Sequence, residues 1–351
     1  MELNEEKLNQ LLGKVVTEMG AAANGPLVML GDKLGLYKCL AQSGPMNSTE
    51  LADETNTAER YVREWLSAQA ASGYVTYHAE SKSFSMTPEQ AAVFGNPESP
   101  VFMGGAFYSV TSVYQDAPKM ETAFKTGEGV AWGDHSNCLF CGTEKFFSPS
   151  YEANLISQWI PSLEGVEEKL KTGAKVADIG CGYAASTIIM AKAYPNSTFI
   201  GYDYHDKSIE HAKQKAKAEG LNNVSFEVST AKSFPGENYD LIMFFDCLHD
   251  MGDPVGACAH VKQALKPDGT CMIVEPFAND ALEENLNPVG RAFYAFSTTL
   301  CTPCSLNQEV GLALGAQAGE KRLREVATSG GFSRFRRATE TPFNLILEAR
   351  A

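Results

Sequence analysis

Small and acidic residues gather in one short segment, Asp178-Ile179-Gly180-Cys181-Gly182, whose types and spacing suit a nucleoside-containing cofactor. The two glycines allow the backbone to turn sharply and to approach a ligand closely. Asp203 follows about 20 residues later, where a carboxylate at the end of a second strand could accept hydrogen bonds from both hydroxyls of a ribose. The run from Gly180 to Ala185 is also a loose match to the dinucleotide fingerprint G-x-G-x-x-[GA].

The charge of this turn separates two kinds of cofactor. A dinucleotide would bring an anionic pyrophosphate to the loop and to the N-terminus of the following helix, where the carboxylate of Asp178 would repel it. S-adenosylmethionine carries no phosphate, but it has an ammonium group and a positive sulfonium. We therefore expect S-adenosylmethionine, with Asp178 in the turn near its methionine end. The alternative is that Asp178 caps a turn and the glycines only permit close packing.

A histidine follows another apolar segment. Leu241–Phe245 is expected to be a buried strand, and Leu248-His249-Asp250-Met251 comes soon after it. Because the carboxyl ends of parallel strands share one edge of a sheet, His249 is expected beside Gly180 and Asp203. An imidazole can accept a proton near neutral pH, so His249 is the candidate general base for a nucleophile that must lose its proton.

The ring of His249 would need a second group to orient it. Asp250 is the adjacent carboxylate and the first candidate. Neighbouring residues often point in different directions, so Asp246 and Glu275 are alternatives. The competing interpretation is that His249 only shapes the pocket.

The elements that must position these residues alternate between strands and helices from Ala174 onward. This alternation predicts an α/β domain with a Rossmann-like, mostly parallel seven-stranded sheet and an antiparallel hairpin at its C-terminal end. Strands are expected at 175–179, 198–203, 224–228, 241–245, 270–274, 335–338 and 344–348, and helices at 186–193, 207–219, 254–265 and 320–328.

Residues 1–95 are expected to form a mainly helical winged-helix domain. Apolar residues recur at helical spacing over 26–40, N-cap residues in the segment 47–52 precede a short second helix, and a third helix is expected over 59–71. Two short strands, 74–77 and 83–86, would form the wing. The order of three helices and a two-stranded wing is that of a winged helix.

The helix of this domain that would enter a DNA groove does not suit phosphate binding. Arg60 and Arg63 are offset by Glu59 and Glu64, which leaves no net charge among the four. We therefore expect a dimerisation domain, and a homodimer, rather than a DNA-binding domain.

Two further parts complete the predicted organisation. Residues 96–165 are rich in aromatic residues and glycine, and are expected to be a helical linker that lines a substrate pocket. Interdomain core is the alternative for this segment. Residues 166–351 are expected to form the cofactor-binding domain, with 279–310 inserted as a lid.

Residues 174–275 resemble the class I S-adenosylmethionine-dependent methyltransferases. Val176–Gly182 is similar to the first motif of that family, and Phe199–Asp203 is similar to its second. The two-domain arrangement resembles the small-molecule O-methyltransferases of the caffeate and hydroxyindole type, whose Leu-His-Asp-Trp motif is similar to Leu248–Met251. The segment Phe245–Pro254 looks like a widespread bacterial group of two-domain methyltransferases.

The resemblance implies a transferase that moves the methyl group of S-adenosyl-L-methionine to a small-molecule acceptor, with His249 as the general base and Asp250 beside it. Oxygen is the expected acceptor atom, and a small thiol or amine is the alternative. Cofactor contacts are expected from Asp178, Gly180, Cys181, Gly182, Asp203, Tyr204, Thr230, Ala231 and Phe245, and substrate contacts from His135, Trp132, Arg291 and Tyr294.

Two positions depart from the pattern of that family. Ala184 stands where a third glycine is common, and an alanine disfavours positive φ. Ser229-Thr230-Ala231 stands where an aspartate commonly reads the adenine amino group, so a hydroxyl or a backbone amide must take that role.

Composition limits the partners. The chain has 351 residues and a net charge of −14, so we expect it to bind neither nucleic acid nor an anionic membrane. It contains no apolar run of the roughly 20 residues that cross a bilayer, and its first residues lack the pattern of a signal peptide. A cytoplasmic location is expected. Two rival functions are a cofactor-sensing transcriptional regulator without turnover and an oxidoreductase.

Nine scattered cysteines are typical of a reducing compartment, where thiols stay unpaired. Cys138 and Cys141 form one C-x-x-C pair, and Cys301 and Cys304 form another. No metal is expected. The alternatives are a four-cysteine zinc site and thiols that hold a soft substrate.

Overall fold

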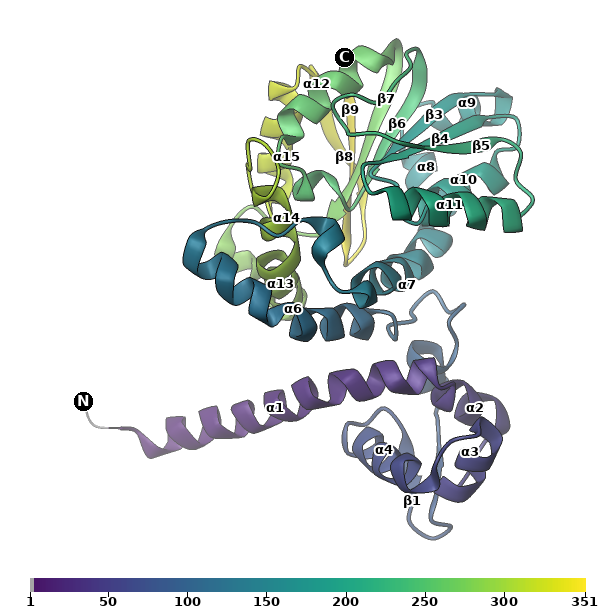
Figure 1. The fold of residues 1–351 in the computed structure, drawn as a ribbon, viewed down its shortest axis with the longest axis vertical. Helices are drawn as coiled ribbons and strands as arrows, with labels where there is room; N and C mark the ends of the chain where they lie inside the picture. Colours follow the sequence, from purple (N-terminus) through teal and green to yellow (C-terminus); the bar gives the residue numbers. More distant parts are fainter. Residues whose placement is uncertain (1–2) are drawn as a thin grey trace. The chain divides into compact units, whose positions relative to one another are not determined.

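A computed structural model describes residues 3–351 and is drawn as a ribbon in Figure 1. The chain divides into two compact units. The first contains the residues up to Tyr114 together with Ser136–Ser150, and the second contains Gln115–His135 and Tyr151–Ala351. The expected boundaries after residues 95 and 165 stay a prediction.

The first unit has the order of a winged helix. A long helix precedes three shorter ones and a two-stranded antiparallel sheet. The helix expected over 26–40 is interrupted at Gly35, which adopts a left-handed conformation with φ of 71°. The elements are α1 (Glu5–Lys33), α2 (Leu36–Ser43), α3 (Ser48–Thr55), α4 (Glu59–Ala71), β1 (Thr76–His78), β2 (Ser83–Ser85) and α5 (Pro88–Gln90).

Aromatic packing joins α1, α2 and α4. A methyl group at Gly31 would lie 2.5 Å from both Tyr37 and Trp65, so only glycine allows α1 to approach these rings. The hydroxyl of Tyr37 donates to Gln69 at 2.7 Å, and the Gln69 amide donates to Asn24 at 2.8 Å. This buried network fixes how α1, α2 and α4 meet, because each polar group would be costly to bury without its partner.

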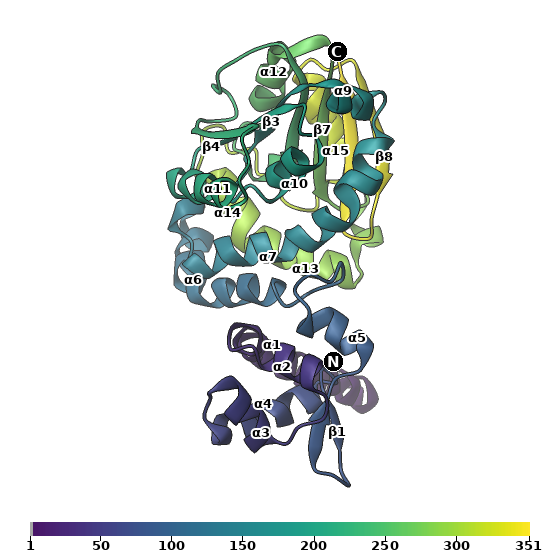
Figure 2. The same cartoon turned by 90° about the vertical axis from the view of Figure 1, so that its right-hand side faces the viewer.

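The second unit is built on a seven-stranded sheet, which confirms the predicted fold class (Figure 2). The strand order is β5-β4-β3-β6-β7-β9-β8, with β9 antiparallel to both neighbours and the other pairs parallel. The strands are β3 (Lys175–Ile179), β4 (Thr198–Asp203), β5 (Val224–Val228), β6 (Tyr239–Phe245), β7 (Leu265–Pro276), β8 (Arg334–Glu340) and β9 (Asn344–Arg350).

Helices cover this sheet and supply its core. Side chains of α12 and α15 join those of β3, β6, β7 and β9 in one buried apolar cluster, and those of α10 and α11 form another with Phe226. Within residues 3–351, no helix is long and apolar enough to span a bilayer. The remaining α-helices are α6 (Ala106–Thr126), α7 (Asn137–Asn154), α8 (Ile160–Ser162), α9 (Val166–Thr172), α10 (Ala185–Ala193), α11 (Asp206–Ala218), α12 (Pro254–Ala264), α13 (Pro288–Phe296), α14 (Thr302–Leu306) and α15 (Gly319–Ser329).

Candidate active site

One edge of the sheet collects candidate site residues at the ends of five strands. The chain leaves β3 toward β4 on one side, whereas β6 lies on the other side, so β3 and β6 flank the topological switch point. The first residue of β9 reaches the same edge because this strand is antiparallel and pairs with the last residue of β7. The residues gathered there are Gly180, Asp203, Asp246, Glu275 and Asn344.

The glycine turn after β3 adopts the conformation that its residues predict. Gly180 and Gly182 have positive φ, and the amides of Gly180 and Cys181 donate to the Tyr202 carbonyl at 2.7 and 3.0 Å. Ala184 also has a positive φ of 63°, despite its methyl group. Its amide donates to Cys181, and its side chain is fully buried, so packing offsets the strain of this departure from glycine.

Asp178 lies in β3 and not in the turn, which corrects its expected position. Its side chain is buried, and its Oδ2 accepts hydrogen bonds from Ser186 at 2.8 Å and Thr187 at 2.6 Å. Its Oδ1 has no partner among the described residues. Burial raises the pKa of Asp178 to about 6, although the two hydroxyl donors act in the opposite direction.

Asp203 ends β4 and is also buried. Its Oδ2 accepts the Gly182 amide at 2.9 Å, and its Oδ1 accepts the His205 amide at 2.8 Å. Burial raises the pKa of Asp203, while these amides favour its charged form. The carboxylate is therefore held in one orientation, with lone pairs left for further donors.

The remaining predicted cofactor residues differ in exposure. Tyr204 is half exposed, and its hydroxyl lies 3.9 Å from the Cys304 sulfur. Thr230 is exposed and shares a 2.8 Å hydrogen bond with Ser233, and Ala231 is half-buried. Phe245 is buried at the end of β6 against the ring of Tyr151. Their expected contacts with a cofactor stay predictions.

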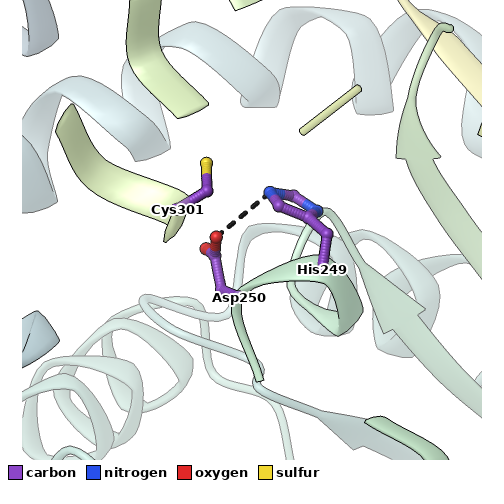
Figure 3. Close-up of side chains that lie close together, drawn as sticks. All are labelled: His249, Asp250 and Cys301. Atoms are coloured by element: carbon purple, nitrogen blue, oxygen red, sulfur yellow. Dashed lines mark ion pairs between the residues drawn. The ribbon is translucent and has the colours of Figure 1, made fainter. Parts of the chain in front are cut away.

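His249 is buried in a short 3-10 turn, Leu248–Asp250, directly after β6. Its Nδ1 lies 2.5 Å from Glu275 Oε2, and Glu275 Oε1 accepts the Leu248 amide at 3.0 Å. Its Nε2 lies 3.2 Å from Asp250 Oδ1 (Figure 3). Of the three carboxylates considered for orienting the ring, Glu275 and Asp250 both contact it.

The charge of His249 reflects these contacts. Burial alone would lower the pKa of His249, but the carboxylates of Asp250 and Glu275 outweigh it and raise the pKa well above its usual value. Glu275, at the end of β7, is held by the Leu248 amide, so it fixes the ring as well as the charge.

Asp246, the third carboxylate considered, has other partners. Its Oδ2 accepts the Tyr151 hydroxyl at 2.6 Å, and its Oδ1 accepts the Asn344 amide at 3.0 Å. Burial raises its pKa to about 8. Tyr151 and Asn344 were not among the residues expected here. The sequence could have placed Asn344 here, because this residue begins the last strand of an antiparallel pair and so must lie at this edge of the sheet.

The predicted substrate residues divide into two sets. His135 is buried, its Nδ1 lies 3.1 Å from Asp116 Oδ2, and its Nε2 has no partner in the described chain. Burial lowers the pKa of His135, and Asp116 and Asp250 oppose that shift, so His135 lies within electrostatic reach of Asp250. Trp132 contacts the His135 ring edge-on.

The second set of predicted substrate residues lies on α13. Arg291 is exposed there and Tyr294 is half-buried, and their substrate contacts stay predictions.

The predicted lid packs against the turn that carries His249. Gln308 donates to the Asp250 carbonyl at 2.8 Å, and Ser305 donates to the Met251 carbonyl at 2.8 Å. Segment 129–130 lies over α14, since the Val130 amide donates to the Pro303 carbonyl at 3.0 Å. These contacts hold α14 beside the candidate site.

Comparison with known proteins agrees with this fold. Residues 170–328 match a family model described as a methyltransferase domain, and residues 22–95 match the Rv2258c-like winged HTH domain. Residues 170–328 are therefore similar to a methyltransferase domain. This domain contains the glycine turn, Asp203 and His249, and the expected resemblance and winged helix are confirmed.

The relatives share parts of the chain or its fold. The uncharacterised methyltransferase YcgJ of Bacillus subtilis is 32% identical over 121 residues, which are 33% of this chain and 47% of YcgJ. The chain spans about half the length of the curated relatives it matches. The human N-acetylserotonin methyltransferase, solved with S-adenosylmethionine, has the same fold, with a TM-score of 0.69 and 16% identity. The match covers 100% of this chain and 99% of the human chain. The mitomycin 7-O-methyltransferase MmcR also has this fold, with a TM-score of 0.64 and 17% identity. The match covers 99% of this chain and 100% of MmcR.

The two glycines of the turn should differ in their response to alanine. A methyl group at Gly180 would lie 2.8 Å from the Cys247 sulfur, whereas one at Gly182 meets no described atom within 4 Å. Gly182→Ala should lower the free energy of unfolding by about 1–2 kcal/mol, because alanine is strained in the left-handed conformation and meets no other obstacle. Gly180→Ala should cost more than that, because the clash adds to the strain. Urea denaturation followed by circular dichroism measures both, and equal losses would contradict the described packing.

Proposed function

We propose that the protein is an S-adenosylmethionine-dependent methyltransferase that acts on an oxygen atom of a small molecule, with His249 as the general base. One observation carries the proposal. The Nδ1 of His249 is held by Glu275, and the ring lies at the sheet edge that also carries Asp203 and the glycine turn. A fixed base beside a methyltransferase cofactor motif is suited to deprotonating an acceptor.

The residues present fit the cofactor. Asp178 offers a buried carboxylate oxygen without a partner, which suits the ammonium group. Asp203 keeps lone pairs for the ribose hydroxyls, and the open side of Gly182 allows close approach. In this proposal Cys181, Tyr204, Thr230, Ala231 and Phe245 line the rest of the cofactor site.

The bound cofactor supplies a methyl group on a positively charged sulfur. His249 receives the acceptor proton at Nε2 while Glu275 holds Nδ1, which keeps the ring in the productive orientation. Asp250, 3.2 Å from Nε2, stabilises the imidazolium that forms. Much of the rate comes from placement, because a positioned nucleophile reacts without further loss of freedom.

Oxygen is preferred over sulfur and nitrogen as the acceptor atom. The proteins of the same fold include one named as a 7-O-methyltransferase. A thiol ionises near neutral pH and has less need of a base, whereas this site uses a buried carboxylate to hold an imidazole in place. The electroneutral α4 does not favour the alternative of a DNA-binding regulator.

Asp203→Asn should weaken S-adenosylmethionine binding, because a ribose hydroxyl loses a charged acceptor. The expected loss is about 1–3 kcal/mol, measured by isothermal titration. Asp206→Asn, at the exposed start of α11, is the matched control and should bind as the wild type does. Binding of NAD with none of S-adenosylmethionine would instead indicate an oxidoreductase.

The general base should be visible in the pH profile of methyl transfer. Because carboxylates raise the pKa of His249, this residue is protonated below that pKa and cannot accept a proton there. We expect kcat/KM for an oxygen acceptor, followed by release of S-adenosylhomocysteine, to rise with pH through a value above 6.5. Glu275→Gln should move that rise to lower pH. Charged or titratable groups that act on the ring are Asp250, Glu275, Cys301, Asp246 and Cys247.

His249→Ala separates the acceptor classes. Loss of activity by a factor of about 10²–10⁴ is expected for an oxygen acceptor if the imidazole is the base. Near-full activity on the true acceptor would reject the base and favour the thiol alternative. Unchanged S-adenosylmethionine binding in the same variant is the control for folding.

We also propose a homodimer formed through the first unit. One face of α1 exposes a stripe of apolar side chains, in which Val16 is 62% and Met19 is 64% accessible. Their spacing of three and four residues is that of one helix face, and exposed apolar stripes of this kind mark association surfaces. The members are Leu8, Leu11, Leu12, Val15, Val16 and Met19. The nine thiols, all unpaired within residues 3–351, fit the cytoplasmic location that we propose.

Val16→Asp should convert the dimer to a monomer, because it places a charge in the centre of the apolar stripe. Sedimentation velocity at micromolar concentration measures the change. Tyr61→Asp is the control, since Tyr61 is 82% exposed on α4 and outside the stripe. A wild-type chain that sediments as a monomer would overturn the proposal.

A further inference from the structure

Three side chains of different chemistry converge beside the proposed base. His249, Asp250 and Cys301 each place one ligand-type atom within 4.8 Å of the other two (Figure 3). His249 and Asp250 come from the turn after β6, and Cys301 comes from the π-helical turn Ser297–Cys301 between α13 and α14. All three are buried or half-buried.

The nitrogen and oxygen donors are already prepared for a metal. Nδ1 of His249 is engaged by Glu275 at 2.5 Å, which leaves Nε2 to face the cluster. A carboxylate behind a histidine is the usual outer-shell arrangement of zinc sites, because it fixes the ring and makes the ligating nitrogen more basic. Asp250 Oδ1 lies 3.2 Å from Nε2, so the oxygen and nitrogen donors face each other.

The charges of the cluster suit a divalent cation. Asp250 and a Cys301 thiolate would together balance two positive charges, and among residues 3–351 no lysine or arginine forms an ion pair with Asp250 or Glu275. Burial raises the pKa of the Cys301 thiol to about 12, so the thiol is protonated without a metal. Coordination would release this proton, and any proton on Nε2, to solvent.

We propose that His249, Asp250 and Cys301 form a binding site for a thiophilic divalent cation, with zinc as the best match, and that its occupation inhibits methyl transfer. One nitrogen, one oxygen and one sulfur are the donors of tetrahedral zinc with a fourth position open, whereas magnesium and calcium require oxygen donors. Zinc–ligand bonds of about 2.0–2.3 Å require the three donor atoms to draw slightly closer together.

The inhibition follows from the atom that the metal takes. Zinc would bind through the lone pair of Nε2. In the proposed mechanism Nε2 is the atom that receives the proton of the methyl acceptor. This second half of the inference rests on the proposed function, but the binding site does not. The sequence predicted no metal, with a four-cysteine zinc site as the alternative. The proposed site differs from both, because it binds a metal through Cys301 without Cys304.

Binding is tested with the metal alone, on full-length protein freed of metal by a chelator. Isothermal titration with Zn²⁺ should show one site, and Co²⁺ should give the intense near-ultraviolet absorption of a cobalt–thiolate bond. Cys301→Ser should remove this absorption and weaken Zn²⁺ binding by more than about 100-fold, beyond the usual effect of an outer-shell change. Cys304→Ser is the matched control, because Cys304 is buried on the same helical segment but outside the cluster.

Each outcome decides the matter. Absence of Zn²⁺ binding by the wild type, or binding that survives Cys301→Ser, overturns the site. Loss of binding in Cys304→Ser as well as in Cys301→Ser would assign the metal to the cysteine pair and also overturn the proposed site. If Cys301→Ser does not fold, Asp250→Ala removes the carboxylate ligand instead and should also weaken Zn²⁺ binding by more than about 100-fold.

Inhibition is tested separately. Zn²⁺ should inhibit release of S-adenosylhomocysteine by the wild type and by Cys304→Ser, and Cys301→Ser should need about 100-fold more Zn²⁺ for the same effect. Zinc binding without inhibition would overturn the inhibitory role. A metal-free wild type that binds zinc but transfers no methyl group to any acceptor would instead count against the proposed function and leave the metal site standing.

Discussion

A group of buried and half-buried carboxyl groups at one edge of the sheet is the constraint on which the rest of this unit depends. Asp178, Asp203 and Glu275 are buried there, Asp246 and Asp250 are half-buried, and none of the five forms an ion pair with a lysine or arginine in the described chain. Burying a carboxylate is costly unless hydrogen bonds compensate. The fold therefore supplies hydroxyl groups, amides and one imidazole as partners, and burial still raises the pKa of Asp178 to about 6 and of Asp246 to about 8.

This arrangement explains why the surrounding elements are placed as they are. The first turn of α10 brings Ser186 and Thr187 to Asp178, and the glycine turn brings a backbone amide to Asp203. Segments distant in sequence bring Tyr151 and Asn344 to Asp246. An edge organised in this way favours cationic groups, which suits both a sulfonium cofactor and a divalent cation, and it disfavours a pyrophosphate.

The sequence predicted the parts of this unit that depend on local chemistry. Three strands, Lys175–Ile179, Thr198–Asp203 and Val224–Val228, have the expected bounds because apolar and β-branched residues define them without ambiguity. Local pattern gave no information on side-chain direction, so Asp178 was expected in the turn although it points into the core.

Contacts between distant segments were the harder part of the site. Asp246 was a reasonable candidate to orient His249 until its bonds to Tyr151 and Asn344, 95 and 98 residues away in the chain, were known. Likewise, Cys301 belonged to a C-x-x-C motif in sequence, but its neighbours in space are a histidine and an aspartate. Spacing alone cannot reveal such partners when they come from another element.

The antiparallel direction of β9 has a consequence for how the site is assembled. Its first residue, Asn344, completes the hydrogen bonds of Asp246, and β9 pairs along β7 from Asn344 to Ala349. Contacts of such large sequence separation are costly to form, because a long loop must close before they stabilise anything. Asp246 therefore has its full set of hydrogen bonds only once β9 has paired with β7. A partly folded chain could form the glycine turn, but it would lack the strand that makes the buried acids tolerable.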